Sequence, residues 1–146
     1  MFETNNSIFI NRLPHDVFNI ITDPAKQSLW QSMTETVEWT SNGSHGVGST
    51  QRVVARFLGR KIESDIEVTA WEPPHRVDWK FVNGPYPAEA SNTLQPQGEG
   101  TLLTSRSKGE MGSFFKLAEG LVARQLEKQL TANFESLKLL MESGQL

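Results

Sequence analysis

The chain contains no cysteine, a single tyrosine and only three histidines among its 146 residues. Without cysteine it can form neither disulfides nor thiolate metal sites. The histidines His15, His45 and His75 are far apart and lack the spacing of metal ligands, and no HExxH or acidic calcium-loop pattern occurs. We therefore expect no metal and no cofactor.

Long hydrophobic runs and a strong charge of either sign are also missing. No apolar run approaches the roughly 20 residues of a membrane-spanning helix, and the first residues have neither the basic start nor the apolar core of a signal peptide. The formal net charge of -3 disfavours nucleic acid, whose phosphates attract basic surfaces. We expect one cytoplasmic domain over residues 1–146, a monomer or weak homodimer, with no nucleic-acid partner and no membrane span.

Motifs for catalysis and phosphate binding are scarce. The glycine-rich stretch at residues 42–49 lacks the strand-to-helix setting and the lysine of a phosphate loop, so it predicts a turn. No Gly-x-Ser-x-Gly elbow precedes a helix. Two weak candidates for proton transfer are Glu35, which shares strand parity with Val37 and Trp39, and Tyr86 in a proline-rich loop.

What the sequence does contain is a clear order of secondary structure. A strand over roughly residues 3–11 precedes two short helices that begin at Pro14 and Pro24. A second strand and a meander of five more antiparallel strands follow, with the first two strands at the edges of the sheet. From residue 112 or 113 a single long helix is predicted, with an apolar stripe: Phe115, Ala118, Val122, Leu126, Leu130, Phe134, Leu137 and Met141.

The first turns of that helix carry a second apolar stripe, formed by Phe114, Leu117 and Leu121. This end of the helix is therefore covered on more than one side, or it meets a ligand entrance, a lipid or a protein partner. Burial by the short amino-terminal helices is the simplest of these interpretations.

Three hairpins assign the strand residues to faces. A two-residue Gly59-Arg60 turn would pair Leu58 with Lys61 and Arg56 with Glu63.

A turn through the two prolines at residues 73–74 would pair Ala70 with Val77, and would point Trp71 outward. In the last hairpin, Leu94 faces Leu103 and Asn92 faces Ser105 if the turn is symmetric.

Together these registers define one inward face that is mostly apolar. Its members are Gln51, Val53, Ala55, Phe57, Ile62, Ser64, Ile66, Val68, Ala70, Val77, Trp79, Phe81, Asn92, Leu94, Leu103 and Ser105. A packed core would more often place aliphatic residues at Gln51, Ser64, Asn92 and Ser105, because a buried polar group without a partner costs about 1–3 kcal/mol. The pattern indicates water or a ligand beside these side chains.

Four segments in the right order resemble a known family. The stretch "LPHDVFNIITDPAKQSLW" is similar to the opening helices of the polyketide cyclase/dehydrase and lipid-transport family, and "VTAWEPPHRVDW" resembles its strand, double-proline turn and strand. The segments "LQPQGEGTLLT" and "NFESLKLLME" look like its last hairpin and its helix end.

This family belongs to the START-like (SRPBCC) superfamily, so the resemblance implies an α+β helix-grip fold. In that fold a seven-stranded antiparallel sheet wraps around a long C-terminal helix, with two short helices between strands 1 and 2.

The resemblance also implies a cavity between sheet and helix, with contents that differ among members. We expect a small hydrophobic or lipid-like ligand, bound without catalysis. The alternatives are a cofactor-free cyclase or dehydratase that uses Glu35 or Tyr86, and a protein-interaction module. The expected ligand-binding residues are Trp30, Phe57, Ser64, Ile66, Trp79, Phe81, Tyr86, Asn92, Leu94, Leu103, Ser105, Phe115, Ala118 and Val122.

Overall fold

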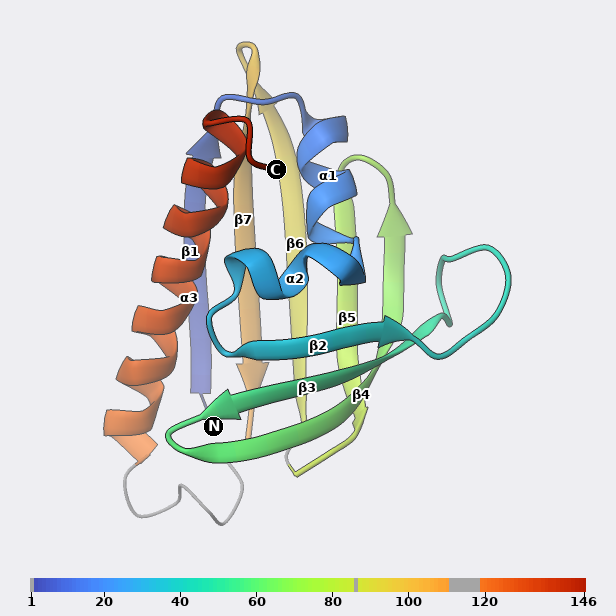
Figure 1. Ribbon diagram of the computed structural model, residues 1–146, viewed down its shortest axis with the longest axis vertical. Coiled ribbons are helices and arrows are strands. Elements are labelled where there is room, and N and C mark those ends of the chain that lie inside the picture. The colour runs from blue at the N-terminus through green and yellow to red at the C-terminus, as the bar shows by residue number, and fades with distance from the viewer. Residues whose placement is uncertain (1, 86, 111–118) are drawn as a thin grey trace.

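A computed structural model describes residues 2–85, 87–110 and 119–146, and shows one antiparallel sheet with three helices in these ranges (Figure 1). The sheet order is β1-β7-β6-β5-β4-β3-β2, so each strand from β2 to β7 pairs with its neighbour in sequence and β1 closes onto β7. The elements are β1 Phe2–Ile10, α1 Pro14–Ile21, α2 Pro24–Trp30, β2 Thr34–Trp39, β3 Thr50–Phe57, β4 Arg60–Glu72, β5 Arg76–Asn83, β6 Ala88–Gln97, β7 Gly100–Gly109 and α3 Glu119–Glu142.

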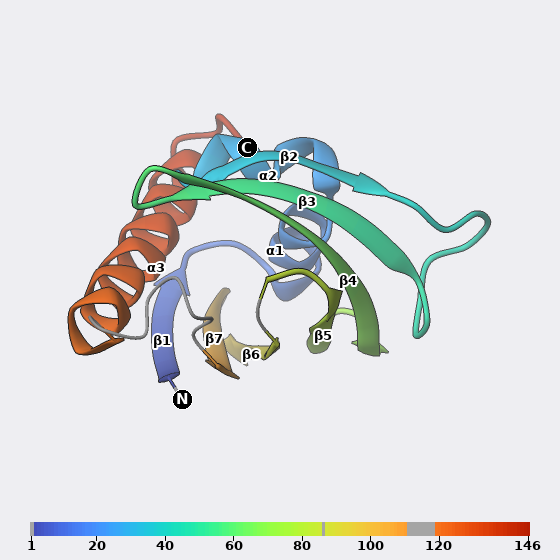
Figure 2. The same cartoon turned by 90° about the horizontal axis from the view of Figure 1, so that it is seen from below.

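The sheet is strongly curled and forms a half-barrel. Figure 2 shows β2 and β3 passing over the inner side of β1, β7 and β6, with α3 along the open side next to β1. The short helix α1 lies inside the curl, between the two halves of the sheet, and α2 lies beside the edge strand β2. The predicted seven-stranded helix-grip fold is confirmed in the described residues.

Both short helices begin where the sequence predicts, at prolines whose fixed φ suits the first helical turn. Asp23 caps α2, because its Oδ1 accepts a hydrogen bond of 3.0 Å from the Ala25 amide. Helix α1 buries Val17, Phe18, Ile20 and Ile21. Helix α1 thus turns its apolar side into the curl, while α2 buries Gln27 and Trp30.

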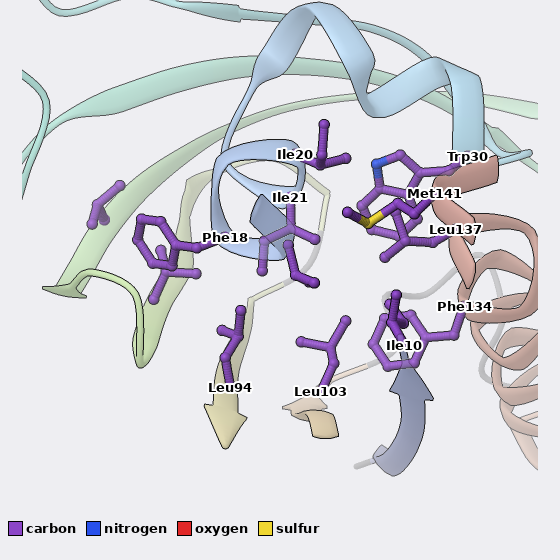
Figure 3. Close-up of a cluster of buried hydrophobic side chains, with 13 residues drawn as sticks. Ile10, Phe18, Ile20, Ile21, Trp30, Leu94, Leu103, Phe134, Leu137 and Met141 are labelled. Atoms are coloured by element: carbon purple, nitrogen blue, oxygen red, sulfur yellow. The ribbon is translucent and has the colours of Figure 1, made fainter. Parts of the chain in front are cut away.

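The main hydrophobic core lies at one end of the half-barrel (Figure 3). Ile10 of β1, Leu103 of β7 and Leu137 of α3 have no exposed surface, and Met141 is almost as deeply buried. Figure 3 shows these side chains facing Ile21 of α1 across the core. Burial of this cluster fixes α1 and the C-terminal half of α3 on the sheet.

The β3–β4 hairpin differs from its predicted register. The turn residues are Leu58 and Gly59, with φ of 52° and 78°, as a type I′ turn requires. Arg56 therefore pairs with Lys61 instead of Glu63. The prediction was wrong by two positions, but a shift of two keeps every side chain on its predicted face.

In the β4–β5 hairpin, a bulge changes the direction of one tryptophan. The pairing of Val68 with Trp79 is as predicted, but the register shifts between Val68 and Ala70, so that Trp71 faces Val77. The predicted outward direction of Trp71 was wrong, because a bulge adds one residue to β4 and reverses the side-chain alternation beyond it. Trp71 instead packs against the core.

The last hairpin has the predicted register. Leu94 pairs with Leu103, and Asn92 pairs with Ser105. The turn between β6 and β7 is formed by Gly98 and Glu99, and Gly98 has a φ of 61°. A symmetric two-residue connection therefore fixes these inward pairs.

Helix α3 keeps the predicted stripe over its described length, with Val122, Phe134, Leu137 and Met141 buried. The predicted start at residue 112 or 113, and with it Phe114, Phe115, Leu117 and Ala118, lies outside the described residues. Leu121 is 72% exposed, so the short amino-terminal helices do not bury it. None of the described helices is both long and apolar enough to cross a membrane.

Candidate ligand-binding site

The curled sheet, α2 and α3 surround a hollow of about 280 Å³. Every residue predicted to point inward from β3, β4 and β5 lines it, except Ala70. Trp71 takes the place of Ala70 because of the bulge in β4. Leu126, Leu130 and Phe134 of α3 complete the apolar lining on the helix side.

All four tryptophans of the chain, Trp30, Trp39, Trp71 and Trp79, line this hollow. The rings of Trp39 and Trp71 meet edge to face with centroids 6.4 Å apart, and Trp71 meets Phe18 in the same way at 5.3 Å. These contacts hold two of the indoles in fixed positions. The hollow therefore has a rigid aromatic wall.

Three polar side chains on the sheet are buried at the hollow, with exposures of 8% for Gln51, 4% for Ser64 and 5% for Asn92. The Asn92 Nδ2 donates to the Val77 carbonyl at 3.3 Å. Within the described part of the chain, no hydrogen bond reaches the Gln51 amide, the Ser64 hydroxyl or the Asn92 Oδ1. These groups are available to an occupant of the hollow.

Several amide side chains on the helix side are already paired, whereas the buried Trp30 Nε1 of α2 has no partner among the described residues. Gln27 donates to the Ile21 carbonyl at 2.6 Å and accepts from Gln31 at 2.6 Å, and Gln31 accepts from Thr34 at 2.7 Å. Asn133 of α3 accepts from the Ser32 amide at 3.1 Å. These bonds attach α2 to its neighbours, so their role is to shape the hollow.

The site is nearly free of charge. Among the described lining residues, only Glu89 is ionisable, and it forms an ion pair of 3.1 Å with Lys108. The described residues contain no cluster of histidine and acidic side chains that could hold a metal ion. Arg52, by contrast, pairs with Asp65 and Glu63 on the outer face of the sheet.

The structure brings together most of the residues predicted for the site. Leu94 and Val122 are buried beside it, Leu94 in the main core and Val122 against Phe57, without lining the hollow. Tyr86, Phe115 and Ala118 lie outside the described residues. The predicted residues that line the hollow are Trp30, Phe57, Ser64, Ile66, Trp79, Phe81, Asn92, Leu103 and Ser105.

Glu35 does not face the hollow. The β2–β3 register shifts between Thr34 and Thr36, and the Glu35 carboxylate forms an ion pair with Arg56. Its side chain is 40% exposed. The inward direction expected from its parity with Val37 was wrong, because the irregularity interrupts the alternation on which parity depends.

Several lining residues were not foreseen. Gln27 of α2, with Gln31 and Met33 just after it, reaches the hollow because α2 packs between β2 and α3, and the sequence of a short helix does not specify that position. Phe2 lines it from β1. Strand parity could have predicted this position, since Phe2 lies on the same face of β1 as the buried Ile10.

Together the curled antiparallel sheet, the long C-terminal helix and the hollow between them define a START-like, helix-grip protein. A START superfamily protein from Mycobacterium smegmatis superposes with a TM-score of 0.71 at 16% identity, covering 94% of this chain and 99% of that chain. TTHA0849 from Thermus thermophilus gives a TM-score of 0.83 at 19% identity, covering 97% and 98%. The di-domain ARO/CYC BexL gives 0.74 at 13% identity, covering 97% of this chain and 47% of that protein.

Within that class, the chain belongs to the polyketide cyclase/dehydrase and lipid transport family, whose model matches residues 1–142. Uncharacterized proteins of Mycobacterium tuberculosis and Mycobacterium bovis are 32% identical over 76 residues. That match covers 52% of this chain and 44% of each relative, so the chain matches less than half the length of these curated relatives.

Proposed function

We propose that this protein binds a small hydrophobic or lipid-like molecule in the hollow between sheet and α3, without catalysing a reaction. The observation that carries the proposal is an aromatic hollow of about 280 Å³ with three buried groups on the sheet, the Gln51 amide, the Ser64 hydroxyl and the Asn92 Oδ1, that have no partner among the described residues. At about 24 cal/mol per Å³, a dry void of this size would cost on the order of 7 kcal/mol. That is comparable with the whole stability of a small domain, so an occupant is strongly favoured.

The lining suits apolar contact. Trp79 and Phe81 of β5 and Phe57 of β3 form one wall, and Leu126 and Leu130 of α3 face the same space. Burying apolar ligand surface contributes about 25 cal/mol per Å². A molecule that fills the hollow would gain most of its affinity from this contact.

The same lining gives little support to acid–base catalysis. Proton transfer needs a titratable group within hydrogen-bonding reach of the substrate. Glu89, the ionisable residue among the described lining, is held by Lys108, and Glu35 is held by Arg56 away from the hollow. This distribution favours binding over turnover.

The four tryptophans at the hollow provide a direct test. Bromine quenches indole fluorescence at contact distance, so bromodecanol should quench the emission and decanol should compete with it. Both should also raise the thermal unfolding temperature, because a ligand that binds only the folded state stabilises it.

Ala90 lies on the inward face of β6 beside Trp79, and Thr93 is exposed on the outer face of the same strand. Ala90→Phe should fill the hollow and abolish quenching, while Thr93→Phe adds the same ring outside and should bind normally. The proposal is wrong if no alkyl or aromatic probe quenches the wild-type protein, or if quenching is the same in Ala90→Phe.

A further inference from the structure

A row of polar side chains crosses the inward face of β6, β7 and β1. The register places Asn92 opposite Ser105, and Ser105 opposite Asn6. Two residues along, Ser107 lies opposite Thr4. On the core side the neighbouring row is apolar and includes Leu94 and Leu103, so the polar residues form a confined patch.

Only some of the polar groups in this patch have a hydrogen-bond partner among the described residues. The hydroxyls of Thr4 and Ser107 bond to each other, and the Asn6 Oδ1 accepts from Thr131 of α3 at 3.0 Å. Asn92 and Ser105 both line the hollow. Among the described residues, neither the Asn92 Oδ1 nor the Ser105 hydroxyl has a hydrogen-bond partner.

These two free groups open onto the hollow. In the described ranges, the side-chain polar atoms that are fully buried and lack a hydrogen-bond partner belong to Trp30 and Asp78. The Asn92 Oδ1 and the Ser105 hydroxyl are not among them, so these two groups without a partner keep some exposed surface. The bond from Asn92 Nδ2 to the Val77 carbonyl fixes the amide, so that its Oδ1 remains as an acceptor. A serine hydroxyl beside it can donate or accept.

The charges around this pair restrict what can bind there. The described lining contains no lysine, arginine or histidine, and its single ionisable side chain, Glu89, is negative and paired with Lys108. A carboxylate or phosphate in the hollow would lose its hydration without gaining a cation from the described lining, which is strongly unfavourable. A hydroxyl group would lose much less hydration free energy, and it could form hydrogen bonds with both Asn92 and Ser105.

We propose that the hollow selects an uncharged alcohol or phenol, whose hydroxyl donates to Asn92 Oδ1 and accepts from the Ser105 hydroxyl, and that it rejects the corresponding carboxylate. The inference rests on the proposed function, since it specifies the ligand class of the same site. Asn92 is then the residue that determines specificity, while the aromatic wall supplies affinity.

Calorimetric titration with matched ligands tests this selection. The probes are naphthol, naphthoate and naphthalene, and decanol with decanoate, at neutral pH where both acids are ionised. Each hydroxyl compound should bind at least tenfold more tightly than its carboxylate. In Asn92→Leu, naphthol should lose about tenfold in affinity, while naphthalene should bind as well as before or better.

Gln95→Leu is the matched control, because it makes a similar change at an exposed position of the same strand and should bind all five compounds like the wild type. Equal or tighter binding of the carboxylates would overturn the inference and leave the proposed function intact. An equal loss of naphthol and naphthalene in Asn92→Leu would overturn the role of Asn92. Failure of every probe to bind the folded wild type would overturn both proposals.

Discussion

Leu58 has a φ of 52°, a left-handed conformation that bulky residues rarely adopt, and its side chain is 53% exposed at the tip of the β3–β4 hairpin. Its Cβ meets the backbone unfavourably there, at a cost of about 1–2 kcal/mol. The type I′ turn formed with Gly59 requires this φ at both central residues, and asparagine followed by glycine is the preferred pair.

Replacing Leu58 with asparagine should therefore raise the free energy of unfolding by about 1 kcal/mol, because asparagine tolerates the left-handed region. Urea denaturation measures the change. Leu58→Ala is the control, since alanine removes the same exposed side chain but lacks the polar group with which asparagine hydrogen-bonds locally in the left-handed region. A similar gain in both variants would contradict the strain argument.

Residue directions could be predicted from the sequence wherever the strands alternate without interruption. This holds for the inward residues of β3 and for the Asn92–Ser105 pair. It fails for Trp71 and Glu35, because a register irregularity lies beside each. Such irregularities depend on how neighbouring strands curl, and no turn residue in the sequence predicts where they occur.

At the scale of elements, α3 is attached to the β1–α1 connection by its last turn. Glu142 accepts bonds of 2.8 Å from the Asn11 amide and from Lys138, and Lys138 also donates to the Phe9 carbonyl. Arg12 donates to the Glu142 carbonyl at 3.1 Å. The Lys138 ammonium and then the Asn11 amide hold the pKa of the Glu142 carboxyl below its usual range.

Because the pKa of Glu142 is lower in the folded state, its contribution to stability is present above the unfolded pKa, near 4.3, and is lost as the pH falls through the folded value. Glu142→Gln should therefore lower stability at neutral pH by less than about 1 kcal/mol, since the carboxylate is partly exposed. The two unfolding curves should converge in acid. Glu135→Gln, on an exposed position of the same helix, should show no such pH dependence, and a constant difference for Glu142→Gln at all pH values would contradict the assignment.

The type and order of the elements were predictable because each has a strong local signal, such as Pro14 and Pro24 at the helix starts or the apolar stripe of α3. The position of α2 between β2 and α3 could not be predicted, because it depends on hydrogen bonds between distant segments. One of these is the Ser32 amide bound to Asn133 of α3. The polar residues that α2 brings to the hollow were therefore missed.

At the scale of the whole molecule, the hollow gives the folded state a volume that packed side chains do not fill. Pressure favours unfolding in proportion to the void that unfolding eliminates. The half-barrel should therefore be more sensitive to pressure than a protein of equal size with a filled core.

Ala90→Phe should shift the pressure of half-unfolding upward and reduce the volume change, because the added ring occupies the hollow. High-pressure fluorescence of the tryptophans measures both quantities. Thr93→Phe should behave like the wild type. Identical volume changes in all three proteins would mean that the hollow does not act as a void.

The pairing of β1 with β7 has a consequence for synthesis on the ribosome. β1 is made before β7, yet the two strands are neighbours in the described sheet, and the bonded pair Thr4 and Ser107 is separated by 103 positions. At a synthesis rate of about 5–20 residues per second, β7 is completed on the order of 10 s after β1. During that interval the apolar side chains of Phe2 and Ile10, both buried in the folded protein, have no partner strand to pair with and cover them.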